Sequence, residues 1–304
     1  ASTLEALHRP LKEAEGTVTY DRNRLIVDLN VTEDSGRSGA LAGEFLLGAD
    51  RRAADIERLT VTVGRVAWRL ADLPVPPRIT WDGNGVATTL LALVDTASGD
   101  QRLDISGMWR KGDASPIHVT ATHVSLSTIE EMLGRPARLG GAVDLDAVVR
   151  RGGAGPVVTG TFSIRGGRVD RLSYEMLAGR VGYQGGVFDV DVRLDQAPAV
   201  WLTATGTVPL GLVAPSQPDD PIRVSIRSSP IALGLVEGVT AAIRDVRGEM
   251  RMNVDVLGTA RDPHVEGIVE LADAGFTVPG TGALYKNGSA RFEIVRDRVT
   301  VGAF

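Results

Sequence analysis

The sequence predicts an all-β protein built from antiparallel sheet, and three observations support this fold class. Apolar and polar residues alternate with a period of two along most of the chain, which is typical of strands with one dry and one wet face. The connections are rich in Gly, Pro and Asn, as in WDGNG (81–85) and APSQPDDP (214–221). A strand–turn–strand pattern also recurs at an offset of 107 residues, from Asp146–Ile164 to Asn253–Leu271.

The composition excludes several classes of protein. Of 304 residues, 43% are hydrophobic and 23% charged, which indicates a folded rather than a disordered chain. A net charge of −5 argues against a nucleic-acid binder, which needs a basic footprint. The absence of cysteine excludes disulfides, thiolate metal sites and cysteine nucleophiles. No apolar run approaches the roughly 18 residues that span a bilayer, and the charged start is no signal peptide, so we expect an excerpt of a longer protein.

The alternation assigns the strands one by one. In each of them the odd or the even positions are apolar, while most of the intervening positions carry Asp, Arg, Asn or Ser. The strands predicted in this way cover 25–31, 66–70, 143–149, 188–194, 222–226 and 250–256. Each of them is expected to contribute one apolar face.

Helices are expected in only a few places. Leu4, Leu7 and Leu11 have helical spacing, so a short helix is predicted in the first fifteen residues, kinked by Pro10. A second is predicted over 125–134, with a capping box at Ser127 and Glu130 and Gly134 as its stop. A weaker candidate covers 229–239.

The repeat suggests how the chain is organised. Its glycines and prolines coincide, as in Gly141 with Gly248 and Pro156 with Pro263, while the apolar residues keep their phase and change identity. We expect an N-terminal short helix and partial β unit over 1–106, then β repeat units over 107–210 and 211–304. All three are expected to form one continuous segment of a longer protein.

Two short helices cannot cover a sheet of this size, so the apolar face needs another cover. It can meet a second sheet, close on itself, or remain as an open groove. Periodicity alone favours a closed core, such as a sandwich.

The order of motifs resembles a known family. Strands that end in Gly (LDISG, LTATG) precede strands that open with PI, then a short helix, a GxVxLxxxV strand and a P-x-V-x-G strand, with late hairpins such as VGYQGGVFDV. Upstream, VAWRLADLPVPPRITWDGNGVATTLLALV adds a Trp-bearing strand, a proline break and two further strands. Over about 56–304 this resembles the periplasmic β-rich region of TamB-like translocation and assembly proteins, relatives of the AsmA-like and bridge-like lipid-transfer proteins.

The resemblance implies an elongated, repeat-built antiparallel sheet folded lengthwise around an apolar groove, a β-taco, with one or two short helices. It implies a non-enzymatic conduit in the periplasm that moves phospholipids between the inner and outer membranes and supports outer-membrane protein assembly. The expected partners are phospholipid acyl chains and, through segments outside this chain, an outer-membrane β-barrel. The expected membrane anchor in the inner membrane also lies outside this chain.

The candidate groove residues are the apolar-face residues of the repeated strands. They are Val143, Leu145, Val149, Phe162, Ile164, Val190, Val192, Leu194, Ile222, Val224, Met250, Met252, Val254, Val256, Val269, Leu271 and Ile294. No catalytic residue, metal ligand or cofactor is expected. The alternative is a structural or adhesive β-sandwich or solenoid with a closed core. A carbohydrate-active β enzyme is a third possibility, although no carboxylate pair stands out from the polar strand faces.

Overall fold

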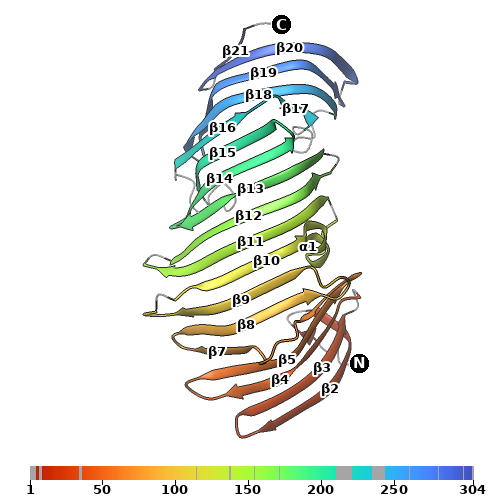
Figure 1. Ribbon diagram of the computed structural model, residues 1–304, viewed down its shortest axis with the longest axis vertical. Coiled ribbons are helices and arrows are strands. Elements are labelled where there is room, and N and C mark those ends of the chain that lie inside the picture. The colour runs from red at the N-terminus through yellow and green to blue at the C-terminus, as the bar shows by residue number, and fades with distance from the viewer. Residues whose placement is uncertain are drawn as a thin grey trace. The chain divides into compact units, whose positions relative to one another are not determined.

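The computed structural model is all-β, as the alternation predicts (Figure 1). It describes residues 5–6, 9–33, 36–113, 115–136, 138–153, 155–170, 172–209, 221–234, 244–259, 261–279, 281–296 and 298–302. These residues form strands β1 to β21 and one helix, α1. The chain divides into two compact units: unit 1 is Ala1–Ala137 with Val143–Gly153, and unit 2 is Arg138–Ala142 with Ala154–Phe304.

Unit 1 is an antiparallel sheet whose strands mostly pair in chain order. The strands are β1 (Glu5–Ala6), β2 (Arg9–Asp21), β3 (Arg24–Glu33), β4 (Ser38–Leu47), β5 (Arg52–Val63), β6 (Val66–Leu70), β7 (Arg78–Asp82), β8 (Gly85–Asp95), β9 (Arg102–Arg110) and β10 (Ile117–Ser125). The short strands β6 and β7 share one position, because each pairs with β5 on one side and β8 on the other. The proline break predicted from LPVPP therefore divides one strand position into two.

Unit 2 is also built from antiparallel strands. Its strands are β12 (Gly155–Val169), β13 (Leu172–Gln184), β14 (Val187–Ala197), β15 (Val200–Pro209), β16 (Pro221–Ser228), β17 (Ile231–Ala232), β18 (Arg244–Thr259), β19 (Pro263–Val278), β20 (Ala283–Val295) and β21 (Arg298–Val301). Consecutive strands pair from β12 to β16, β16 pairs with β18, and β18 to β21 pair in order. Strand β11 (Leu139–Gly152) contributes residues to both units.

The predicted repeat corresponds to two pairs of successive strands. When 107 is added to the residue numbers of β11 and β12, the resulting ranges match β18 and β19. The bounds differ by no more than two residues at either end. Gly141 and Gly248 both have positive φ, at 112° and 102°. Pro156 and Pro263 both lie within the first two residues of the second strand of their pair, a position where strands tolerate proline. The turn residues keep their places, as the sequence predicts.

The helix predictions have mixed outcomes. The N-terminal helix is wrong, because residues 9–21 form β2, which pairs with β3; cross-strand pairing outweighs the helical spacing of the leucines. Helix α1 (Leu126–Met132) is present, and Gly134 follows it with a φ of 70°. The capping box is wrong: the N-cap is Ser125, without a side-chain capping bond. In the third candidate Ile231–Ala232 forms β17, while 235–239 lie outside the described residues.

Glycines inside the strands allow the strands to bend. Gly206 in β15 has a φ of 143°, and a Cβ there would lie 1.9 Å from the carbonyl oxygen of Arg223 on β16. At Gly267 in β19, a Cβ would lie 2.2 Å from the carbonyl oxygen of Asn253. Only glycine fits such a close approach in a strand. Figure 1 shows β18, β19 and β20 as bent ribbons.

Among the described residues, no helix is long and apolar enough to cross a membrane.

Candidate functional site

The strand register gathers the predicted groove residues of unit 2 on one face, here called the apolar face of unit 2. Cross-strand partners lie side by side on the same face of an antiparallel sheet. One row of such partners crosses eight strands: Phe162, Gly179, Val192, Ala204, Ile226, Val254, Gly267 and Ile294. Every member is apolar or glycine. The predicted residues Val190, Val224 and Val256 belong to the next row on this face.

The opposite face of unit 2 is polar. A second row of cross-strand partners lies one residue away from the apolar row on each strand. It consists of Arg180, Asp191, Thr205, Ser225, Asp255 and Glu266. Its charges are paired, with 2.7 Å between Arg180 and Asp191 and 3.0 Å between Arg227 and Asp255. The hydrogen bond from the Ser225 hydroxyl and the pairing with Arg227 hold the pKa of Asp255 below its ordinary value. Successive residues of a strand point to opposite faces, so one face of unit 2 is apolar and the other is charged and polar.

The predicted groove residues are mostly half-buried. Leu194, Ile222, Met250 and Val254 are buried, and the others are intermediate; none of them is exposed. A closed sandwich core would be expected to bury most of such aliphatic side chains.

One part of the apolar face of unit 2 is closely packed. Ile231 and Leu233, in and after β17, form a buried cluster with Met250 and Ala274. The predicted residues Met252, Val269 and Leu271 pack against this cluster. Strand β17 pairs with β18 in the sheet, and Ile231 lies directly opposite Met250, so these positions are packed together rather than open. The sequence pattern missed β17 because two residues of strand leave too short a periodic signal.

Unit 1 has an apolar face of its own. A row of cross-strand partners crosses β3 to β5 and β7 to β10: Leu25, Phe45, Ala54, Ile79, Thr88, Gly107 and Ile117. Toward one end of the strands, α1 contacts both β6 and β10, and the main-chain N–H of Arg65 donates to Glu131 at 3.0 Å. The predicted residues Val143, Leu145 and Val149 lie on β11 in the part assigned to this unit.

The other end of this face carries aromatic and cationic side chains. The next row of partners reads Leu47, Arg52, Trp81, Val86 and Trp109, all within two residues of a strand end. The guanidinium carbon of Arg151, near the end of β11, lies 5.6 Å from the centroid of the Trp109 ring. We call Arg52, Trp81, Val86, Trp109 and Arg151 the Trp–Arg rim. The sequence pattern does not show that these tryptophans belong together, because only the register between strands brings them into one row.

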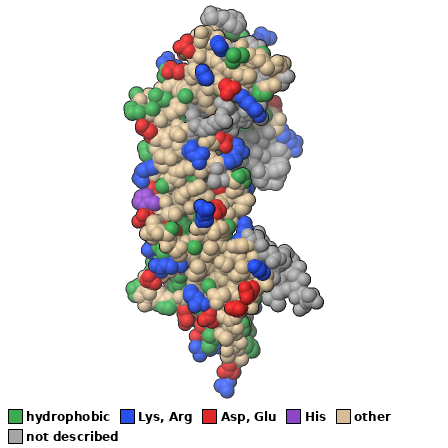
Figure 2. All heavy atoms as spheres, turned by 90° about the vertical axis from the view of Figure 1, so that its right-hand side faces the viewer, with side chains coloured by type: hydrophobic (Ala, Val, Ile, Leu, Met, Phe, Trp, Pro, Cys, Tyr) green, Lys and Arg blue, Asp and Glu red, His purple; other side chains and the backbone are tan. Residues whose placement is uncertain are grey.

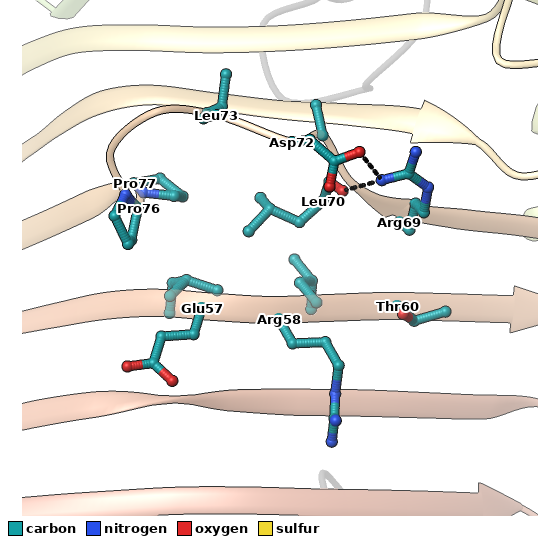
Figure 3. Close-up of a pocket in the computed structure, with 12 residues that line it drawn as sticks. Glu57, Arg58, Thr60, Arg69, Leu70, Asp72, Leu73, Pro76 and Pro77 are labelled. Carbon is teal, nitrogen blue, oxygen red and sulfur yellow. Dashed lines mark hydrogen bonds and ion pairs between the residues drawn. The ribbon is translucent and has the colours of Figure 1, made fainter.

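Unit 1 also contains a pocket where β6 and β7 share their strand position (Figure 3). About 330 Å³ in volume, it is lined by Ile56–Thr60, Arg69–Leu73, Pro76 and Pro77. Figure 3 shows Leu70 between the prolines and the Arg69–Asp72 ion pair, which measures 3.1 Å. Arg58 pairs with Asp28 outside the pocket. The guanidinium groups of Arg58 and Arg69 are thus already paired and are not directed at a ligand. The pocket is best explained as the gap that the proline break leaves in the sheet.

The charged side chains on the side drawn in Figure 2 are mixed rather than grouped by sign. Figure 2 shows basic and acidic side chains interspersed on the side that it draws, with hydrophobic side chains between them. In the part of the chain that the structure describes, no group of three or more His, Asp or Glu side chains is arranged to hold a metal ion. Comparisons with protein-family models, with curated proteins and with solved structures find no match to this chain.

Proposed function

We propose that this chain is a segment of a periplasmic lipid conduit, in which phospholipid acyl chains move along the apolar sheet face between the inner and outer membranes. The proposal includes the TamB-like kinship inferred from the motif order, and an outer-membrane β-barrel as partner through segments outside this chain. The chain itself performs no reaction in this proposal. Its contribution is a surface along which lipid moves.

The row from Phe162 to Ile294 supports this proposal most directly. It is apolar across eight strands, and of its members only Val254 is buried. A half-buried aliphatic face without hydrogen-bonding side chains suits a cargo that must slide, because no single position holds it tightly. Carrying a two-tailed lipid through water exposes about 30 methylenes at about 0.8 kcal/mol each, or about 24 kcal/mol. An apolar track removes most of that cost.

The packed cluster around Ile231 and Met250 is the observation that favours the alternative, a structural protein with a closed core. Extraction of lipids from the purified protein, followed by mass spectrometry, separates the two. The conduit predicts a heterogeneous set of phospholipids at a reproducible ratio to protein. A folded protein that carries no lipid and binds no apolar dye would contradict the conduit and favour the closed core.

A further inference from the structure

We propose that the Trp–Arg rim of unit 1 binds the anionic phosphate of a two-tailed phospholipid whose acyl chains lie on the apolar face of unit 1. This inference rests on the proposed function in one respect, because it takes lipid as the occupant. It adds a headgroup class and a place where that headgroup is held.

The rim combines two Trp–Arg couples at the edge of one face. Arg52 and Trp81 are direct cross-strand partners on β5 and β7, and Trp109 on β9 lies beside Arg151. Val86 on β8 joins the couples, since it is the cross-strand partner of both tryptophans. Neighbouring strands lie about 4.8 Å apart, so the backbones of the two tryptophans, two strands from each other, are separated by about 10 Å.

The arginines of the rim are available for an anion. Arg52 and Arg151 are exposed, and neither has a carboxylate partner among the described residues. Arg180 and Arg227 on the polar face of unit 2, by contrast, are each paired with an aspartate. A guanidinium can donate two parallel hydrogen bonds to a phosphate, which makes arginine well suited to this group.

The tryptophans mark the boundary between the apolar face and water. Trp81 and Trp109 are half-buried, while Leu47 and Val86 in the same row are 39% and 36% exposed. An indole ring combines a large apolar surface with one N–H donor, which is why tryptophan is enriched at the interface between a bilayer and water. Arginine beside it can keep its charged end in water while its methylenes cover apolar surface.

The layout of the face favours an amphiphile over a free anion. From the rim the face continues into the row of Phe45, Ala54 and Ile79, and α1 contacts the sheet toward the other end of the strands. A phosphate held at the rim therefore places attached acyl chains over aliphatic residues. Inorganic phosphate would use the arginines and leave that surface unused.

The test compares two lipids with identical acyl chains, phosphatidylglycerol and diacylglycerol, which differ by the anionic headgroup. The full chain and its R52Q/R151Q variant are incubated with vesicles that contain each lipid, and the lipid retained after separation is titrated and quantified. The wild type should retain phosphatidylglycerol more tightly. The variant should lose at least about tenfold in that affinity, because even one hydrogen bond to a charged group contributes that much, with diacylglycerol retention unchanged.

Arg193→Gln provides the matched control. Arg193 also lies over a tryptophan, at 5.1 Å from the Trp201 ring centroid, but on the polar face and paired with Asp195. This variant should retain both lipids as the wild type does. If wild type and R52Q/R151Q retained phosphatidylglycerol equally, the headgroup site would be overturned and the conduit would stand. The same would follow if R52Q/R151Q lost both lipids equally. Failure of the wild type to retain either lipid would overturn the conduit and, with it, the site.

Discussion

Asp95 is a buried carboxylate at the end of β8, only 4% exposed. Burial by itself would raise its pKa, but hydrogen bonds from the N–H groups of Ser98 and Gln101, at 2.8 and 2.9 Å, and from the Ser98 hydroxyl lower it below its ordinary value. The Gln101 side chain accepts in turn from the N–H of Ser125, the N-cap of α1. This carboxylate therefore organises the turn between β8 and β9, and Gln101 connects that turn to the start of α1.

Replacing Asp95 with Ala should destabilise the protein at neutral pH by about 1–3 kcal/mol, because the part-buried N–H groups of Ser98 and Gln101 lose their acceptor. A group whose pKa is lower in the folded state stabilises the fold above its unfolded pKa, near 3.9, and loses that contribution as pH falls through the folded pKa. The difference between wild type and variant should therefore shrink in acid. Urea unfolding at pH 7 and at pH 3 measures this difference in folding stability. If the difference did not depend on pH, the charge of Asp95 would not be what stabilises the turn.

At the scale of elements, the apolar face of unit 2 is uneven. Val192 on β14 and Val254 on β18 belong to the same row, yet Val192 is half-buried and Val254 is 5% exposed. Alternation assigned both to one face and could not separate them. Their burial depends on what lies over each strand, which is a property of packing.

The two valines should therefore respond differently to a charge. Val254→Asp buries an unpaired carboxylate and should cost more than about 3 kcal/mol of folding stability. Val192→Asp can hydrate its carboxylate, so the fold should persist while lipid retention falls. Thermal unfolding and lipid extraction of each variant distinguish these outcomes.

Asn253→Asp, one residue from Val254 on the polar face and opposite Arg227, controls for added charge and should leave both properties unchanged. Unfolding of the Val192→Asp variant would instead indicate a packed core at that position.

At the scale of the whole molecule, the chain is divided between two units, each with its own strand network. Structures in which elements contact mainly their chain neighbours often unfold in parts rather than in one step. Three of the four tryptophans, Trp68, Trp81 and Trp109, belong to unit 1, and Trp201 belongs to unit 2.

This distribution allows the units to be followed separately. In a Trp201→Phe variant all tryptophan fluorescence comes from unit 1, whereas far-ultraviolet circular dichroism reports the strands of both units. We expect urea unfolding curves from the two signals to differ in midpoint. Coincident curves, with one slope appropriate to 304 residues, would show that the units unfold together.

The sequence by itself determined the all-β class, six of the strands between Leu25 and Val256, the proline break before Arg78 and the paired strands of the repeat. These features follow from local chemistry: side chains alternate across a pleated strand, and Gly and Pro are confined to a few backbone conformations. The same local reasoning failed for residues 9–21, because helical spacing of leucines is a weak preference that cross-strand hydrogen bonds override.

Only the tertiary structure decided which strands lie side by side and what covers them. Register between strands aligned Trp81 with Arg52 and brought Trp109 into the same row, although 28 residues separate the two tryptophans in the chain. The pairing of β17 with β18 placed Ile231 beside Met250 in a buried cluster, whereas Val192 is half-buried. Periodicity fixes the face on which a side chain lies, but its neighbours and its exposure depend on contacts between residues distant in the sequence.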